Sequence, residues 1–423
     1  ASGSIFVISF AWRESSTLIQ LNFIALLSLI LITLSRINNK SHYFYLIDLF
    51  SSFFAGFYTL LISPVTKTRQ EIKHIGLYPG LKRSLWGVLR GLAISLPFVF
   101  LAGTLLISAD TGFSQYLDDL FSVSFSLPTF TVPLIISVFI AIAFLTRLKP
   151  YQPLKWYQSL SSSSSLPGME VVTILTSLNI VFALYIKVQI SYYFGDDAMI
   201  QNTNGIAYAE YARTGFFQLV SLSIVVLGFL WSLAWFMRKD VQIFGFWFKI
   251  MALIMIGLLT VIEASAIHRM ILYTNAYGLT EARFYALALM LWVGLIYIIF
   301  ALTILKSKRG QFLANALACG MGIVIILNFI NPAALITQYN LTHTTKNKVD
   351  IYYLTNLGPD AYPTIINNIN LINQKNRCVT VKYIEGHLRV LYKDWRNWSW
   401  GIQNTRKALS NLIIKCPSTQ QNK

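Results

Sequence analysis

Charged residues are scarce in this chain: Asp, Glu, Lys and Arg together make up only 12% of its 423 residues. Soluble proteins usually carry roughly 25%. So few charges cannot cover the surface of a water-soluble protein of this length, and the composition excludes that class. The mean hydropathy of +0.57 and the 55% share of hydrophobic residues indicate instead that lipid surrounds most of the chain.

Sequence motifs for soluble-type catalysis are missing as well. The chain contains no Gly-rich phosphate loop, no paired CxxC and no HExxH, and it has no GxSxG nucleophile motif. Its five histidines do not have the spacing of metal ligands. We therefore predict no catalytic residues, no metal and no cofactor, and the sequence favours a protein that is not an enzyme.

Cysteine is rare, with three residues in the chain. Cys319 lies in a predicted membrane span, where we expect a small packing residue. A bridge between Cys378 and Cys416 would close a loop of about 38 residues, worth roughly 3–4 kcal/mol. We predict this disulfide because small domains outside the cytoplasm often need one. Two free thiols are the alternative.

The chain is basic, with a formal net charge of +17. Its Lys and Arg residues lie mostly in short stretches between apolar runs, rather than in one patch interleaved with aromatics, which argues against nucleic acid binding. Basic loops of this kind are typical of the cytoplasmic side of a membrane. We therefore predict contact with a lipid bilayer and no nucleic acid partner.

A membrane-spanning helix needs about 20 predominantly apolar residues, and about nine stretches of the chain reach that length. They are residues 17–35, 43–65, 86–108, 127–148, 171–194, 215–237, 243–268, 284–305 and 312–336. The predicted fold class is therefore an all-α polytopic transmembrane helix bundle, which forms a domain over residues 1–336.

The distribution of Lys and Arg predicts the orientation of these spans. The loops after the second, fourth, sixth and eighth spans are rich in Lys and Arg, which places them in the cytoplasm. Arg36 and Lys40, after the first span, go against this pattern. An odd number of spans then predicts a cytoplasmic N-terminus and a C-terminal domain on the extracytoplasmic side.

Residues 337–423 are more polar and predict a small soluble α+β domain. Residues 350–363 indicate a short helix followed by a turn at Gly358-Pro359, and residues 365–372 indicate a second helix. Residues 378–383 and 387–392 alternate apolar and polar side chains around Glu385-Gly386, which predicts a β-hairpin. Residues 398–414 have the pattern of an amphipathic helix.

Ionisable residues within predicted spans are costly and indicate function, and three of them are candidates for a functional role. They are Asp48, Lys187 and Glu263. The long side chain of Lys187 can reach the headgroup layer, which is a structural explanation for it. Glu263 has no such explanation, so a transporter or channel is one alternative function.

A second group of polar residues lies at the predicted outer ends of the sixth, seventh and eighth spans. It comprises Tyr208, Glu210, Arg213, His268, Arg269, Tyr277, Glu281 and Arg283. Guanidinium groups bind carboxylate or phosphate oxygens in pairs, so convergence of these arginines would make a lipid-headgroup or anion site. The structural alternative, which we favour, is an ion-paired cluster that fixes the helix ends. A lipid- or glycan-processing membrane enzyme is the corresponding second alternative function.

The C-terminal domain also contains the aromatic segment DWRNWSW at residues 394–400. Exposed Trp and Arg side chains are common anchors at protein interfaces. We predict that Trp395, Arg396, Trp398 and Trp400 bind a partner, which would be another membrane or periplasmic protein subunit. A non-enzymatic membrane subunit, scaffold or sensor is therefore the favoured function.

Several stretches resemble a family of bacterial multi-pass membrane proteins, domain-of-unknown-function group four-one-seven-three. These stretches are Trp12-Arg13 with Leu21-Asn22, Ser108-Ala109-Asp110 with Phe113 and Leu117, residues 208–219, residues 269–283, Asn331-Pro332, Tyr339-Asn340 and Asp394-Trp395-Arg396. The resemblance implies a multi-pass topology and a bacterial inner membrane, but it implies no catalytic residues. Members of that group usually have more sequence before the Trp-Arg pair, so an upstream segment is expected.

Overall fold

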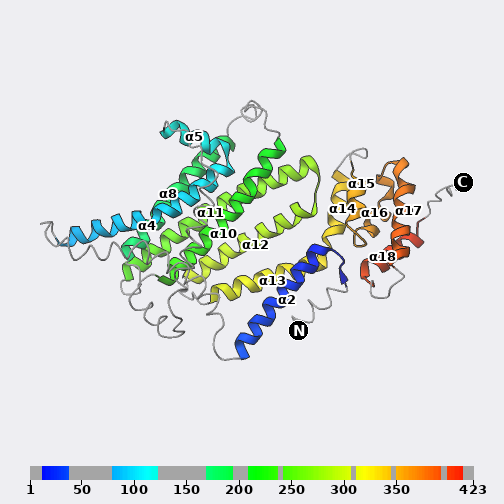
Figure 1. The fold of residues 1–423 in the computed structure, drawn as a ribbon, viewed down its shortest axis with the longest axis horizontal. Helices are drawn as coiled ribbons and strands as arrows, with labels where there is room; N and C mark the ends of the chain where they lie inside the picture. The colour runs from blue at the N-terminus through cyan, green and yellow to red at the C-terminus, as the bar shows by residue number, and fades with distance from the viewer. Residues whose placement is uncertain are drawn as a thin grey trace, which may run out of the picture. The chain divides into compact units, whose positions relative to one another are not determined.

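The computed structural model describes residues 12–37, 79–121, 168–193, 208–236, 242–305, 311–343, 349–391 and 398–412. Within these ranges every regular element is a helix and none is a strand. Figure 1 shows the helices in chain order, from blue at the N-terminus to red at the C-terminus.

Six of the described helices are long and apolar enough to cross a membrane. These candidate spans are Leu85–Ala109, Gly168–Ile190, Phe216–Ala234, Gly245–Tyr277, Glu281–Thr303 and Phe312–Ile330. They belong to α4 (Pro79–Ala109), α8 (Gly168–Tyr193), α10 (Tyr208–Phe236), α11 (Gln242–Tyr277), α12 (Glu281–Leu305) and α13 (Phe312–Ile330). The multi-pass membrane architecture is therefore confirmed.

The predicted number of nine spans is not supported. The first prediction, residues 17–35, corresponds to α2 (Ser16–Ile37), but its described apolar part, Ser16–Ile30, is shorter than the six candidate spans. The predictions at residues 43–65 and 127–148 lie outside the described residues.

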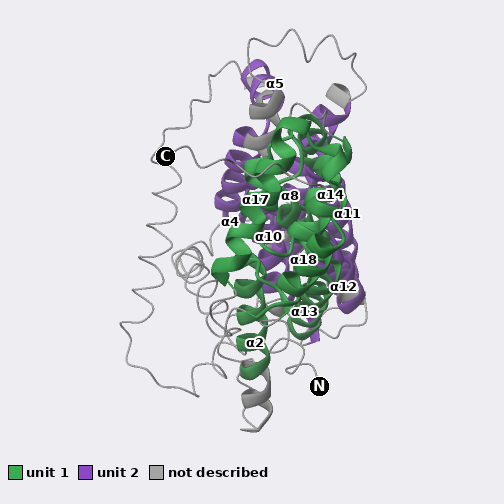
Figure 2. Ribbon diagram, turned by 90° about the vertical axis from the view of Figure 1, so that its right-hand side faces the viewer, with its two compact units in different colours: residues 1–39, 270–292, 313–423 green, residues 40–269, 293–312 purple. Residues whose placement is uncertain are grey.

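The chain divides into two compact units, which Figure 2 shows in green and purple. Unit 1 comprises Ala1–Asn39, Met270–Trp292 and Leu313–Lys423, and unit 2 comprises Lys40–Arg269 and Val293–Phe312. Each unit therefore combines segments that are far apart in the sequence.

Unit 2 is built around α4, which packs against α8 and α10. Gly91 of α4 lies so close to α8 that a Cβ atom there would approach the Cβ of Thr173 to 2.6 Å. A side chain at residue 91 would push the two helices apart, so Gly91 permits their close contact. The short helix α5 (Thr111–Phe121) follows α4 and packs on both α4 and α8.

In unit 1, α13 ends sooner than predicted. The backbone of Asn331 takes a left-handed conformation, with φ of 57°, and Pro332 begins the next helix, α14 (Pro332–His343). The Asn331 side chain accepts a hydrogen bond from the Ala334 N–H at 3.2 Å, as a helix N-cap does. The predicted span at residues 312–336 therefore ends at Ile330, and Ile336 lies in α14.

Beyond α14, the C-terminal region contains α15 (Ile351–Asn356), α16 (Tyr362–Asn367), the 3-10 helix η3 (Ile369–Leu371), α17 (Gln374–Leu391) and α18 (Trp400–Ser410). Its buried core includes Ala333 and Ile336 of α14, Ile365 of α16 and Ile384 of α17. Leu279, in the connection between α11 and α12, belongs to the same core. The helices after the last span thus pack directly on a connection between two spans.

The predicted α+β fold and its hairpin are wrong, because residues 374–391 form the single helix α17. Its buried residues are Thr380, Val381, Ile384 and Leu388, a spacing that follows the turn of a helix. Glu385 and Gly386, predicted as a turn, lie on its exposed side. The predicted turn at Gly358 and the predicted last helix are both present, as a glycine with φ of 84° and as α18.

Candidate functional site

Two buried arginine–aspartate ion pairs lie in the described residues, one in each unit, and each is the centre of a polar network. The centre in unit 1 is formed by Arg13, whose side chain reaches the C-terminal end of α13. Its Nε donates a hydrogen bond to the Asn328 carbonyl at 2.7 Å, and an Nη atom donates to the Phe329 carbonyl at 3.3 Å. The last carbonyls of a helix have no partner within the helix and favour a nearby cation. Arg13 therefore caps the end of a membrane span.

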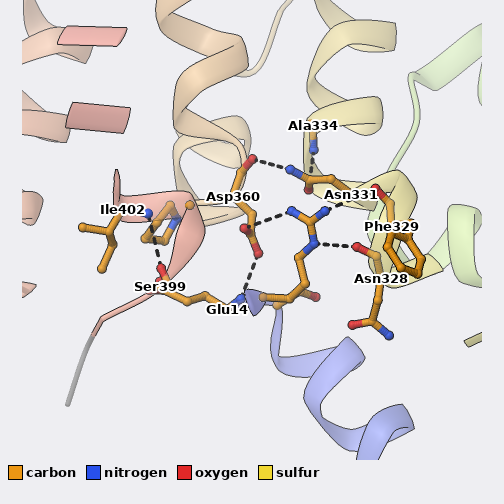
Figure 3. Close-up of polar contacts among 12 residues, drawn as sticks. Glu14, Asn328, Phe329, Asn331, Ala334, Asp360, Ser399 and Ile402 are labelled. Carbon is orange, nitrogen blue, oxygen red and sulfur yellow. Dashed lines mark hydrogen bonds and ion pairs between the residues drawn. The ribbon is translucent and has the colours of Figure 1, made fainter. Parts of the chain in front are cut away.

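The same guanidinium forms an ion pair with Asp360, between α15 and α16, at 3.6 Å. The side chains of Arg13 and Asp360 are 7% and 1% exposed. The other carboxylate oxygen of Asp360 accepts a hydrogen bond from the Glu14 N–H at 2.8 Å, and its main-chain carbonyl accepts one from Asn331 at 3.0 Å (Figure 3). We call Arg13, Glu14, Asn331 and Asp360 the clasp, because together they join the N-terminal segment, the end of α13 and the C-terminal helices.

Further contacts hold the N-terminal segment in unit 1. Asn22 and Asn328 exchange two side-chain hydrogen bonds, at 3.1 and 2.8 Å. Ser15 donates to Glu281 at 3.2 Å, and the Trp12 ring packs edge-on against Phe329 with ring centroids 5.0 Å apart. Buried amide pairs of this kind satisfy each other's donors and acceptors. The segment before α2 is therefore fixed against the end of α13.

The clasp also joins the N-terminal segment to the C-terminal helices. Arg13 touches both the last turn of the candidate span α13 and Asp360 of those helices. The predicted orientation of the two termini stays a prediction, because residues 43–65 lie outside the described residues.

Burial raises the pKa of the Asp360 carboxyl above its ordinary value, although Arg13 and the Glu14 N–H partly oppose this shift. Burial likewise raises the pKa of Glu14. A carboxyl whose pKa is higher in the folded protein than in the unfolded chain binds its proton more tightly when folded. Its contribution to stability is therefore greatest below the unfolded pKa of about 4 and is lost as pH rises through the folded pKa.

We accordingly expect the unfolding temperature of the wild-type protein, relative to the Asp360→Asn variant, to decrease between about pH 4 and neutral pH. The measurement is a pH series of thermal unfolding for both proteins in the same detergent. The difference between the two curves removes the contribution of titrating groups that do not interact with Asp360, and Glu14 is the carboxyl coupled to it. A difference that does not change with pH, or that increases with pH, would contradict the assignment.

The polar centre of unit 2 is the ion pair between Arg269 of α11 and Asp110, which follows the last residue of α4. The two groups are 2.5 Å apart, and their side chains are 5% and 6% exposed. Asp110 also accepts hydrogen bonds from the N–H groups of Gly112 and Phe113, at 2.9 and 3.2 Å, and so caps α5. One carboxylate thus joins the end of α4, the start of α5 and Arg269 within α11.

Gln189 of α8 completes this second centre. Its amide nitrogen donates to Asp110 and to the Tyr185 hydroxyl, both at 2.8 Å, and its oxygen accepts from Ser265 of α11 at 2.7 Å. The amide therefore uses both its donors and its acceptor within the protein. The network is satisfied internally, which is the arrangement expected of a structural ion-pair cluster.

A cavity of about 240 Å³ lies beside this network, between α8 and α11. Its lining residues are Tyr185, Ile186, Gln189, Ile190, Val261, Ile262, Ala264, Ser265 and His268. Glu263 is buried but is not among them. Its carboxylate instead lies toward α12, where a Cβ atom on Gly294 would be 3.6 Å from it. The cavity therefore gives no support to a transport path through Glu263.

The described members of the predicted outer cluster have separate partners. Arg269 binds Asp110, whereas Arg283 donates to the Gly278 carbonyl and lies over the Tyr273 ring at 3.9 Å. Glu281 accepts from Ser15, Tyr277 is exposed, and His268 lines the cavity.

The remaining predicted residues are only partly described. Tyr208, Glu210 and Arg213 belong to α10, but their side chains are outside the description, so convergence of the three arginines stays a prediction. Lys187 is exposed on α8, whereas Asp48, Trp395, Arg396 and Cys416 lie outside the described residues. The Cys378–Cys416 bridge also stays a prediction, and Cys319 is a free thiol in α13.

Sequence reasoning did not identify Arg13, Asp110 and Asp360 as site residues. Asp110 entered the sequence analysis only within a stretch that resembles the family, and Asp360 only within residues 350–363. The available signal was an arginine, Arg13, beside a span with no acidic residue among its close sequence neighbours except Glu14. A buried arginine of that kind needs a partner from elsewhere in the fold.

A family model described as "Domain of unknown function (DUF4153)" matches residues 1–368. No curated protein and no solved structure matches the chain. The predicted membership in a family of unknown function is confirmed, although the matching model is DUF4153 rather than group four-one-seven-three. Since the match covers more than half of the sequence, the chain belongs to the DUF4153 family.

Proposed function

We propose that this protein is a non-enzymatic subunit or scaffold of a bacterial inner membrane, and that residues 337–423 form an extracytoplasmic module that binds a partner protein. In this orientation residues 12–15 are also extracytoplasmic, because the clasp holds them to that module.

The observation that supports partner binding is the fixed display of two tryptophans. Trp398 and Trp400 are 52% and 50% exposed, whereas Ser399 between them is 3% exposed. Ser399 has an extended backbone, with φ of −141° and ψ of 160°, and its hydroxyl caps α18 by accepting the Ile402 N–H. Side chains alternate in direction along an extended chain, so turning Ser399 inward turns both rings outward.

Because Trp398 and Trp400 are already held in place, a partner that binds them would pay little conformational entropy. The buried cap fixes the backbone at Ser399, which lies beside Glu14 of the clasp in Figure 3. Large aromatic rings held in place before association lose little freedom on binding, and such residues are frequent hot spots. The predicted disulfide at Cys378 would add a further restraint on this module.

The test is site-specific photo-crosslinking in intact cells, with a photoreactive amino acid in place of Trp398 or Trp400. We expect a crosslinked protein adduct at either position, and none at Tyr352, which is 75% exposed on α15 and serves as the matched control. The double variant Trp398→Ala and Trp400→Ala should lower co-purification of that partner at least about tenfold, the loss of one hot spot.

Equal crosslinking at Tyr352 and Trp400 would show that exposure alone produces the adducts. Absence of any protein adduct at Trp398 and Trp400, with the full-length protein present in the membrane, would refute the proposed function.

A further inference from the structure

The outward face of α17 has an unusual composition. Val379 and Val390 are 68% and 63% exposed, and Tyr383 is 45% exposed. β-branched apolar side chains gain nothing from such exposure, and a group of them on one surface marks an interaction site. The three residues are spaced at i, i+4 and i+11, so they lie in one row along the helix.

A second row, of basic residues, runs directly beside the first. Lys375, Lys382 and Arg389 are exposed and follow one another at intervals of seven residues, which places them on one side of the helix. At 100° per residue, the basic row and the apolar row fall within a single arc of roughly 120°. We call these six residues the α17 face.

The α17 face is directed away from the core of unit 1. Val381, Ile384 and Leu388, on the opposite side of α17, belong to the core that also contains Leu279 from the connection between two spans. In Figure 1, α14 and α16 lie between α13 and α17. The α17 face therefore lies away from α13 within unit 1.

The net charge of residues 337–423 helps to decide which kind of molecule binds the α17 face. Residues 337–423 contain twelve Lys and Arg residues against four Asp and Glu residues. A second copy of this chain would bring like charges together across a two-fold axis, which is unfavourable. A polyanion would satisfy the basic row but would leave the valines in water.

We propose that the α17 face docks into a groove on an acidic protein, with Val379, Tyr383 and Val390 in an apolar groove and the three basic residues against carboxylates at its edge. This is the mode in which an amphipathic helix face binds a partner. The inference rests on the proposed function and specifies the chemistry of the partner. Electrostatic complementarity along the basic row would also steer the encounter, so binding should weaken with added salt.

The test is photo-crosslinking from Val379 and Val390 in intact cells that express the full chain. The expected adduct is a separate protein whose crosslinked peptide contains more Asp and Glu than Lys and Arg. The double variant Lys382→Glu and Arg389→Glu should reduce the adduct at least about tenfold, because it reverses two of three complementary charges. Thermal unfolding is measured in parallel, because Lys382 also interacts within the protein, and the comparison uses a variant that unfolds at the wild-type temperature.

Glu385→Lys is the matched control, because it also reverses one exposed charge on α17. It makes the helix more basic, whereas the double variant makes it more acidic. An acidic partner predicts that this variant keeps or increases the adduct. Loss of the adduct in Glu385→Lys, no effect of the double reversal, a phospholipid adduct or an adduct to a second copy of the chain would each overturn the inference. Adducts at Trp400 without any at Val379 or Val390 would overturn it while leaving the proposed function intact.

Discussion

Replacing Arg13 with Met is expected to lower the free energy of unfolding by about 3–5 kcal/mol, the usual cost of removing one partner of a buried ion pair. The variant leaves the Asp360 carboxylate 1% exposed and without its counter-charge. It also removes the donors that cap the Asn328 and Phe329 carbonyls at the end of α13. One substitution therefore takes a partner away from three groups, the Asp360 carboxylate and two carbonyls of α13.

The measurement is equilibrium unfolding of the purified protein in detergent, together with the rate of limited proteolysis after α13. Arg377→Met is the control, since Arg377 also donates to two carbonyls but pairs with no buried carboxylate, and it should cost about 1 kcal/mol. Adding Asp360→Asn to Arg13→Met should restore part of the loss, because the amide removes the buried charge and keeps the acceptor for Glu14. If the double variant is as unstable as the sum of the single variants, the two residues are not coupled.

Replacing Arg269 with Met is expected to have a similar effect on unit 2, with a loss of about 3–5 kcal/mol. Asp110 would keep its hydrogen bonds from Gly112, Phe113 and Gln189 but would lose the only cation that contacts it among the described residues. Arg269→Lys should not restore full stability, because an ammonium cannot reproduce the fork of the guanidinium.

The same unfolding experiment measures this variant, with Lys187→Met as the control for loss of one positive charge. Lys187 lies on the outer side of the candidate span in α8, where its long side chain can reach the headgroup layer, so that variant should change stability by less than about 1 kcal/mol. Asp110→Asn combined with Arg269→Met should be more stable than Arg269→Met alone. Equal stability of wild type and Arg269→Met would mean that the network around Gln189 holds the helix ends without the ion pair.

The spans could be predicted from the sequence because lipid requires long apolar helices, and this signal is strong in α8, α10, α11 and α12. Helix ends were harder, since α11 continues past His268 to Tyr277 without a breaker. The end of α13 was visible in principle, because Asn331 tolerates a left-handed backbone and Pro332 favours a new helix start.

The β-hairpin could not be excluded from the sequence, because residues 378–383 alternate apolar and polar side chains while also matching a helix. Packing of Val381, Ile384 and Leu388 in the core favours the helix over the hairpin. Gly386 is tolerated because it lies on the exposed side of α17. The two polar networks around Arg13 and Arg269 could not be predicted from the sequence for a different reason. Each depends on residues far apart in the chain, such as Asp110 and Arg269, and one sequence gives no information on which distant charges meet.

The contact between the Glu14 N–H and the Asp360 carboxylate joins residues 346 positions apart. During synthesis Arg13 leaves the ribosome first, and every span must be made before its partner exists. A chain that stops before residue 360 keeps an arginine at the membrane surface with no carboxylate to receive it. Closure of the clasp is thus a late step of biogenesis, available only to chains whose synthesis has passed residue 360.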